Sequence, residues 1–299
     1  MDPVRSHTAK SRLILGTAGI GMPYGVSNTE GQPSKEKAFE IFDAAFACGI
    51  TTFDTASAYG EAEEILGQWM QRSHHVVSVI TKMKPYEADH GSGFVVAQIE
   101  ASLERLHLDV LDGYLLHAAR DIYVPAVLEG LQSAKERGLV RNVGASVYDE
   151  GEAYDALSTG VDYIQVPYNV FDQRFGRNEF LEKALARKVT VFARSPFLQG
   201  LLLMELTQLP PSLSSARPYL ERFIAVASRH GLSRVEAALG FVLAEEQIPH
   251  IIVGAVSAAQ VRELSSAGVL SYDVVAEMRE LFKDVPDEVR DPRLWTNVA

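Results

Sequence analysis

The 299-residue sequence is poor in cysteine, in long apolar runs and in positive charge. Its single cysteine, Cys48, cannot form a disulfide within one chain, and its apolar surroundings suit helix packing better than a nucleophile. No apolar run reaches the roughly 20 residues that a membrane-spanning helix needs. The opening residues MDPVRSHTAKSR include no apolar stretch typical of a signal peptide. We therefore predict a cytoplasmic protein without a membrane partner.

Positive charge is outnumbered by negative charge. The chain has 28 Lys and Arg residues against 39 Asp and Glu residues, which gives a formal net charge of -11. This excess would repel a phosphate backbone or an anionic lipid surface. With 47% hydrophobic residues, the chain can bury one large core without a second domain. We therefore expect a globular protein that binds no nucleic acid.

Three common active-site motifs are also missing. The pair Gly19-x-Gly21 is followed by Tyr24 instead of the glycine that a dinucleotide-binding fingerprint requires. No Gly-x-Ser-x-Gly elbow is present, and His74-His75 lacks the i, i+4 spacing of a helical zinc pair. These absences argue against a Rossmann dehydrogenase, a serine hydrolase and a metallohydrolase, and we expect no metal ion.

Short β-branched runs alternate with amphipathic stretches along the chain. The runs predict eight strands at 13–15, 51–53, 76–80, 110–116, 142–144, 163–166, 189–192 and 251–253. The amphipathic stretches predict helices at 35–48, 61–72, 93–107, 124–137, 149–158, 178–187, 218–245 and 258–266. Eight such units favour a parallel, closed α/β fold, so we predict a (β/α)8 TIM barrel formed as a single domain by residues 1–299. The longest irregular stretch, 195–217, follows the seventh strand and is a candidate active-site lid.

Four chemically active side chains follow successive predicted strands. Asp54 and Lys82 follow the second and third strands, and His117 follows the fourth. Tyr59 lies in the loop that begins after Asp54, just before the next helix. In (β/α)8 enzymes the chemistry takes place at the C-terminal ends of the strands, so these four groups are expected to converge.

The four residues together suit proton delivery by a tyrosine. A tyrosine hydroxyl normally keeps its proton to about pH 10. A lysine ammonium beside Tyr59 would lower the pKa of the phenol, and an aspartate paired with Lys82 would keep that ammonium charged and aimed. Each residue alone also fits a structural role, as a turn cap, a half-buried aromatic, a solvated strand end or a core histidine. Their joint occurrence favours function, and we predict that the other reactant is a hydride donor.

Several motifs together resemble those of a known family. They are Phe53-Asp54-Thr55-Ala56-x-x-Tyr59-Gly60, Thr81-Lys82, Leu115-Leu116-His117 and Gln165-Val166-Pro167-Tyr168-Asn169. In these motifs, and over nearly its whole length, the sequence resembles the aldo-keto reductase family. The resemblance implies an NAD(P)H-dependent reductase of aldehydes or ketones, with Tyr59 as general acid, tuned by Lys82 and Asp54, and with His117 orienting the carbonyl. We expect a monomer or a weak homo-oligomer that acts on a small-molecule carbonyl or sugar substrate.

The resemblance also implies a cofactor site spread over the strand ends. Its expected residues are Thr17, Asp54, Ser146, Gln165, Arg194, Ser195, Phe197, Gln199, Gly254, Val256 and Gln260. A nicotinamide carboxamide needs both donors and acceptors, which Ser146 and Gln165 supply. NADP(H) is favoured over NAD(H), although Val256 stands where relatives often carry a basic residue.

Substrate contacts are expected from Tyr24 and Lys84. Lys84 lies two residues past Lys82, so an extended backbone would point both side chains the same way. Together with Arg194, Lys84 would offset a carboxylate or phosphate on the substrate. The simpler alternative is that both are solvated cations at the rim.

Two other functions stay open. The stretch from Arg194 to Leu202 resembles bacterial relatives associated with surface-sugar metabolism, which leaves a sugar or sugar-derivative dehydrogenase or reductase as an alternative. The second alternative is a cofactor-binding regulatory subunit that senses redox state and has little turnover. An enzyme would turn over substrate, whereas the regulatory subunit would bind the cofactor tightly with negligible turnover.

Overall fold

Eight parallel strands close into a barrel in the computed structural model, which describes residues 12–26, 28, 31–87 and 90–295. The strands are β1 (Leu13–Gly16), β2 (Thr52–Asp54), β3 (Ser78–Met83), β4 (Leu111–Leu116), β5 (Val140–Ser146), β6 (Tyr163–Pro167), β7 (Thr190–Arg194) and β8 (His250–Gly254). They pair in chain order, and β1 pairs with β8 to close the ring. All eight predicted strands are present with bounds shifted by a few residues, which confirms the predicted barrel.

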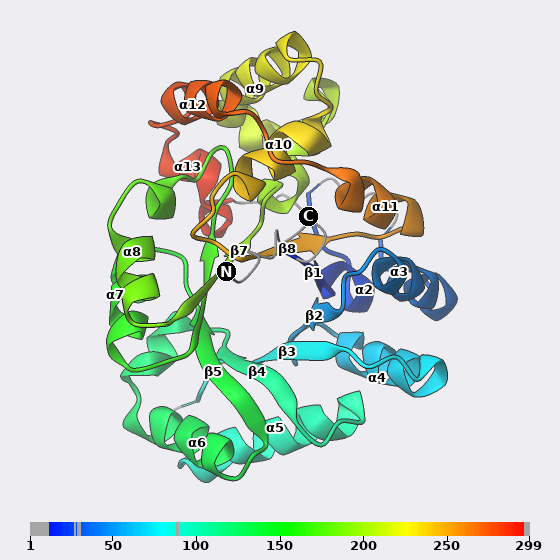
Figure 1. Ribbon diagram of the computed structural model, residues 1–299, viewed down its shortest axis with the longest axis vertical. Coiled ribbons are helices and arrows are strands. Elements are labelled where there is room, and N and C mark those ends of the chain that lie inside the picture. Colours follow the sequence, from blue (N-terminus) through cyan, green and yellow to red (C-terminus); the bar gives the residue numbers. More distant parts are fainter. Residues whose placement is uncertain (1–11, 27, 29–30, 88–89, 296–299) are drawn as a thin grey trace, which may run out of the picture.

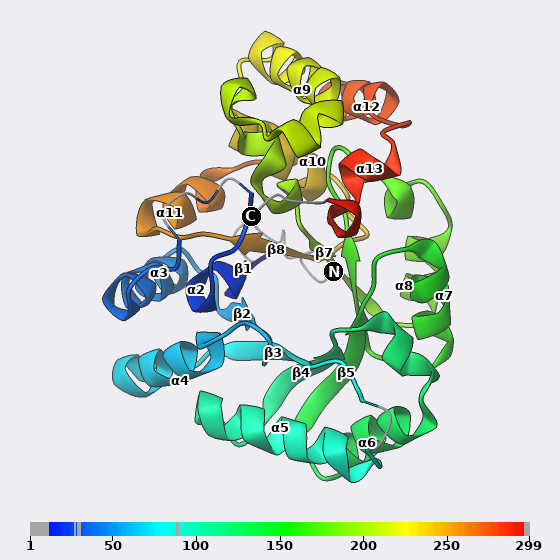
Figure 2. The same ribbon diagram turned by 180° about the vertical axis from the view of Figure 1, so that it is seen from behind.

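Helices surround the barrel in both views (Figures 1 and 2). The α-helices are α2 (Ala18–Gly21), α3 (Lys35–Ala47), α4 (Ala62–Ser73), α5 (Gly93–Leu106), α6 (Pro125–Glu136), α7 (Glu150–Ser158), α8 (Phe180–Ala186), α9 (Arg217–Arg229), α10 (Arg234–Leu243), α11 (Ala258–Ser266), α12 (Tyr272–Leu281) and α13 (Asp287–Arg290). The 3-10 turns are η1 (Ala119–Tyr123), η2 (Arg174–Gly176), η3 (Leu198–Leu203), η4 (Leu206–Gln208), η5 (Pro211–Ala216) and η6 (Pro292–Leu294). Among the helices of the described residues, none combines the length and the apolar character that crossing a bilayer would require.

The single helix predicted over 218–245 is wrong, because two helices occupy this stretch. Helix α9 ends at Arg229, and Gly231 follows with a φ of +65°, a left-handed conformation that glycine adopts without strain. Ser233 then caps α10 through a reciprocal capping box with Glu236. The chain can therefore turn between the helices, and α9 pairs with α12 through an ion pair between Arg229 and Glu277.

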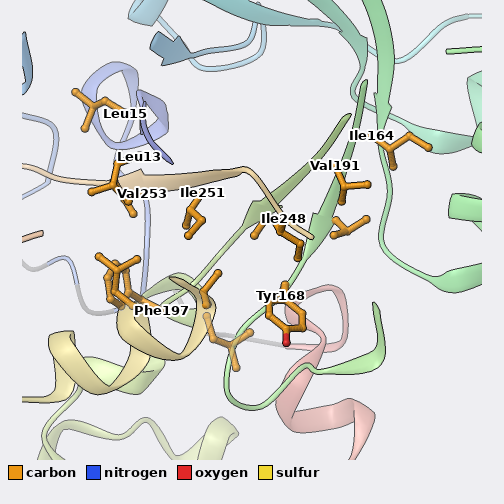
Figure 3. Packing of buried hydrophobic residues seen from close by; sticks show 14 of the residues in the cluster. Leu13, Leu15, Ile164, Tyr168, Val191, Phe197, Ile248, Ile251 and Val253 are labelled. Atoms are coloured by element: carbon orange, nitrogen blue, oxygen red, sulfur yellow. The ribbon is translucent and has the colours of Figure 1, made fainter. Parts of the chain in front are cut away.

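Side chains of the strands alternate between two apolar compartments. Ile14, Ile80, Leu115, Phe192 and Ile252 form a small cluster of their own, against which Tyr163 packs. The residues on either side of Ile14 and Ile252 belong instead to the large cluster between the strands and the helices. Figure 3 shows part of this large cluster, with side chains from β1, β6, β7 and β8. The strict alternation holds each strand in register and so fixes which side chains emerge at the C-terminal ends.

The irregular stretch 195–217 is anchored to the large core. It contains η3, η4 and η5 instead of one extended loop. Leu198, Leu201, Leu202, Met204 and Leu213 are all buried within that core. A lid made of this stretch stays a prediction. Opening such a lid would expose the buried leucines unless only the residues between them moved.

Candidate active site

A cavity of about 430 Å³ opens at the C-terminal ends of the strands. Every strand contributes a lining residue at or within two residues of its end: Gly16, Asp54, Lys82, His117, Ser146, Gln165, Arg194 and Gly254. The parallel barrel therefore collects side chains that are far apart in the sequence, as a (β/α)8 active site requires.

A buried ion pair lies at the ends of β2 and β3. The Nζ of Lys82 is 2.6 Å from Oδ2 of Asp54 and donates a second hydrogen bond, of 3.0 Å, to the backbone oxygen of Thr55. The amide of Gln165 donates to the other oxygen of Asp54 at 2.6 Å. Lys82 is 1% exposed and Asp54 is 4% exposed, so neither charge is screened by bulk water. The predicted pairing of Asp54 with Lys82 is confirmed.

Tyr59 and His117 meet beside this pair. Their ring centroids are 5.6 Å apart and the rings are perpendicular, while the Nζ of Lys82 lies 5.3 Å from the Tyr59 ring centroid. A Cβ on Gly21 would overlap the backbone oxygen of Tyr59, so only glycine permits this approach. The structure thus brings the four predicted residues together.

A second buried polar cluster holds the Tyr59 loop against β3. Glu63, in the first turn of α4, accepts a hydrogen bond of 2.5 Å from the hydroxyl of Thr81. Its other oxygen accepts from Nε of Arg105 at 2.7 Å. Glu63 is four residues past Tyr59, and Thr81 precedes Lys82. This cluster therefore ties the loop that carries the phenol to the strand that carries the ammonium.

Burial raises the pKa of Tyr59, and the carboxylate of Asp54 raises it further. The pKa is thus raised overall, against the expectation of a lowered one, because burial and Asp54 outweigh the effect of the nearby cations. Lys82 itself is already bonded to Asp54, whose negative charge offsets its own. The phenol consequently keeps its proton at neutral pH and has it ready to donate.

Burial lowers the pKa of His117 to about 4, and the positive charge of Lys82 lowers it further. The imidazole is therefore neutral at neutral pH. A neutral imidazole carries one N–H donor, which can point at an oxygen in the cavity.

The depressed pKa of His117 predicts a loss of stability in mild acid. An unfolded histidine takes up a proton near pH 6.5, whereas folded His117 does so only near pH 4. Protonation therefore favours the unfolded chain as the pH falls through this interval, at a cost of roughly 2 kcal/mol after allowing for partial exposure. Denaturant unfolding at several pH values would measure it, with His117→Gln as the control. Parallel stability curves for the two proteins would contradict this prediction.

All the remaining predicted residues except Lys84 line the cavity. Those that line it are Thr17, Tyr24, Ser146, Gln165, Arg194, Ser195, Phe197, Gln199, Gly254, Val256 and Gln260. Lys84 is exposed and is absent from the lining. Its predicted orientation is wrong because β3 ends at Met83, so the alternation that points Lys82 inward does not continue.

Several buried polar atoms in this cavity have no partner within the described residues. They include the hydroxyl of Thr17, Oε1 of Gln165 and Nε of Arg194. An unsatisfied buried donor or acceptor costs about 1–3 kcal/mol, so such groups generally await a ligand. A nicotinamide cofactor, with its carboxamide and ribose hydroxyls, carries donors and acceptors complementary to Thr17 and Gln165.

The backbone after β7 is held in an unusual conformation. Ser195, Leu198 and Gln199 have φ angles of +58°, +48° and +54°, and Gly200 has a φ of +97°. Asn169 supports the first of these residues through a 3.1 Å hydrogen bond to its backbone oxygen. Strained backbone of this kind concentrates at binding sites, where it aims N–H groups at a ligand.

Tyr148 and Glu263 are among the lining residues that were not predicted from the sequence. Tyr148 lies under the guanidinium of Arg194, whose central carbon is 4.1 Å from the ring centroid. Glu263 lines the other end of the cavity, on α11. Tyr148 could have been predicted, because it lies two residues after Ser146, which ends β5. Nothing in the sequence of α11 distinguishes Glu263 as a lining residue.

Comparisons with known proteins agree with this geometry. Residues 12–283 match the Aldo/keto reductase family model. The chain is 27% identical over 291 residues to the NADH-specific methylglyoxal reductase of Escherichia coli (strain K12), covering 85% of this chain and 88% of that protein. It is 29% identical over 303 residues to the L-galactose dehydrogenase of Arabidopsis thaliana, covering 91% and 90%.

Solved structures share the fold. The holo form of an aldo-keto reductase from Bacillus halodurans superposes with a TM-score of 0.75 at 22% identity, covering 94% of this chain and 95% of that chain. The glycerol dehydrogenase of Gluconobacter oxydans gives a TM-score of 0.72 at 21% identity, covering 94% and 93%. The family match and the barrel together show that the chain is an oxidoreductase of the aldo/keto reductase family, whose members use nicotinamide cofactors.

Proposed function

We propose that the protein reduces the carbonyl group of a small aldehyde or ketone with hydride from a nicotinamide cofactor. The observation that carries this proposal is the position of Tyr59 beside His117 and close to the buried Lys82–Asp54 pair. Such an arrangement can orient a carbonyl oxygen, protonate it and offset the charge left behind. The cavity is large enough for a small substrate at this end.

Each residue has a separate part in the reaction. The neutral His117 donates a hydrogen bond to the carbonyl oxygen, which polarises the carbonyl and fixes its direction. Tyr59 donates its proton to this oxygen as negative charge develops there, so hydride and proton together yield an alcohol. The ammonium of Lys82 then stabilises the phenolate, and Asp54 keeps the ammonium in place.

The cofactor would be held by Gln165 and Thr17, whose buried oxygens have no partner among the described residues, and by Ser146. Oε1 of Gln165 accepts from a carboxamide, while its amide remains on Asp54. Ser146 and Thr17 lie at neighbouring strand ends and offer hydroxyl groups. Residues of the loop 195–200 line the cavity and would lie against the pyrophosphate, while the N–H groups of Leu198 and Gly200 already donate to Ser195 and Phe197. When bound, the cofactor supplies the hydride.

Cofactor choice is set at the far end of the cavity. Among the described residues that line it between β8 and α11, none is lysine or arginine, and Glu263 carries a negative charge. We therefore propose that NADH is used at least as readily as NADPH, against the expectation from the resemblance alone. The Escherichia coli relative named as NADH-specific supports this proposal.

Val256→Arg is expected to improve NADPH affinity relative to NADH by about tenfold, because it places a guanidinium where a 2′-phosphate would lie. Titration of both nucleotides, followed by the fluorescence of the reduced nicotinamide, would measure this. Lys37 lines a small neighbouring hollow on the other side of Val256. Lys37→Ala is the control, and a selective loss of NADPH binding in this variant would show that Lys37 already holds the phosphate.

A panel of small aldehydes and ketones with either reduced nucleotide tests the reductase proposal. A sugar dehydrogenase is the second candidate, favoured by the similarity to L-galactose dehydrogenase. Its chemistry reverses the same steps, with Tyr59 taking the proton from a hydroxyl. Assays in both directions, with aldehydes and with sugar lactols, would separate the two.

A further inference from the structure

Arg194 is a cation without a carboxylate partner in a catalytic cavity. The described residues place no Asp or Glu within ion-pair distance of its guanidinium. Its Nη2 donates to the backbone oxygen of Val147 at 2.8 Å, and its Nε is buried without any acceptor. Arg293 also packs on Tyr148, at 4.4 Å from the ring centroid, yet it pairs with Asp291 at 2.6 Å. The charge of Arg194 is therefore held in place but not neutralised.

The position of Arg194 is fixed by its surroundings. It ends β7, and its planar guanidinium is stacked on Tyr148. Pairing of β7 with β6 aligns Arg194 with Pro167, and the Arg194 carbonyl accepts from the backbone of Tyr168. A side chain bonded and stacked in this way loses little further freedom when a ligand binds.

The charge of Arg194 acts at the reacting end of the cavity. Burial has the largest effect on the pKa values of Tyr59, Tyr24 and His117, and the positive charge of Arg194 lowers the pKa of each. The other lining cation, Lys82, is bonded to Asp54. The end that receives the substrate thus carries one uncompensated positive charge, in a chain whose net charge is -11.

We propose that Arg194 forms an oxyanion subsite and that the preferred substrate is an aldehyde or ketone bearing a carboxylate or phosphate group. This inference rests on the proposed carbonyl reduction. The buried Nε–H and a second guanidinium N–H match two oxygens of one oxyanion, and a planar fork favours such bidentate contacts. Because Lys84 is exposed and outside the lining, Arg194 carries this recognition without it.

Matched aldehyde pairs test the subsite. One pair is glyceraldehyde 3-phosphate and glyceraldehyde, and the other is succinic semialdehyde and butanal. The wild type is expected to have a higher kcat/KM for the anionic member of at least one pair. Arg194→Met should lower the anionic-to-neutral ratio of kcat/KM by roughly 10- to 100-fold, with Arg194→Lys restoring part of it. A drop confined to one pair would identify the group as phosphate or carboxylate.

Two controls separate the subsite from other roles. Arg293 also packs on Tyr148 but does not line the cavity. Arg293→Met should therefore leave the anionic-to-neutral ratio of kcat/KM unchanged. NADH affinity should be the same in Arg194→Met and the wild type. The inference is overturned if Arg194→Met slows both members of each pair equally, or if it weakens NADH binding instead, since Arg194 would then serve the cofactor. If the enzyme turns over neutral aldehydes and Arg194→Met leaves the anionic-to-neutral ratio of kcat/KM unchanged, only the subsite inference is overturned. If no carbonyl compound is turned over at all, the reductase proposal is overturned as well.

Discussion

Tyr59→Phe is expected to lower kcat by about 10²- to 10⁴-fold, the usual contribution of a positioned general acid. The substitution removes only the hydroxyl, so the ring can still pack at right angles to His117. Without the phenolic proton, the carbonyl oxygen keeps only the hydrogen bond from the neutral His117, which is a poor proton donor. Steady-state turnover with a reactive aldehyde and saturating NADH would measure the loss.

Tyr114→Phe is the matched control for this prediction. Tyr114 is fully buried on β4 and does not line the cavity. The same chemical change there should leave kcat unaltered, and NADH should bind Tyr59→Phe with wild-type affinity. If Tyr59→Phe kept kcat within a few-fold of the wild type, a different group would have to supply the proton.

Lys82→Met is expected to cost about 3–5 kcal/mol of folding stability in addition to activity. The reason is that Asp54, at 4% exposure, would keep a buried negative charge with only Gln165 and no cation to offset it. Denaturant unfolding at neutral pH would measure the change. Loss of activity alone would not separate a catalytic role from unfolding, so stability and turnover have to be measured on the same preparations.

The double variant Asp54→Asn with Lys82→Met provides the control. Removing both charges eliminates the unpaired carboxylate, so much of the lost stability should return, while activity should stay absent because the tuning pair is gone. Equal losses in the single and double variants would mean that the unpaired carboxylate is not their cause, whereas wild-type stability of both would mean that the ion pair contributes little to folding. Its main role would then lie in the reaction.

The barrel could be predicted from the sequence because its signal is local. Each strand is a short run of buried β-branched and apolar residues, and the following helix has its own apolar face, so the βα rhythm is visible without knowledge of contacts. The candidate site followed from the same rule, since Asp54, Lys82 and His117 lie at or next to the ends of successive strands. Gly231, as a helix stop, and the Ser233–Glu236 capping box signal the division of 218–245 in the sequence, but the helical pattern on both sides of this short break led to a single predicted range.

The errors at the site concern properties that arise only on folding. Lys84 was expected inside because a strand was assumed to continue, whereas β3 ends one residue before it. The pKa of Tyr59 depends on burial and on how far Asp54 offsets Lys82, which spacing does not reveal. Tyr148 gains its importance from stacking under Arg194, a residue on a different strand. Such contacts between distant segments have no pattern within a single stretch of sequence.

NADH oxidation by the purified wild-type protein in the presence of an aldehyde is the most direct test of the central claim. Saturable binding of the nucleotide should be followed by its oxidation in a one-to-one ratio with the alcohol formed. Tight binding without turnover of any aldehyde, ketone or lactol would contradict the claim and point to the redox-sensing alternative. Failure of either nicotinamide nucleotide to bind would contradict the cofactor site itself.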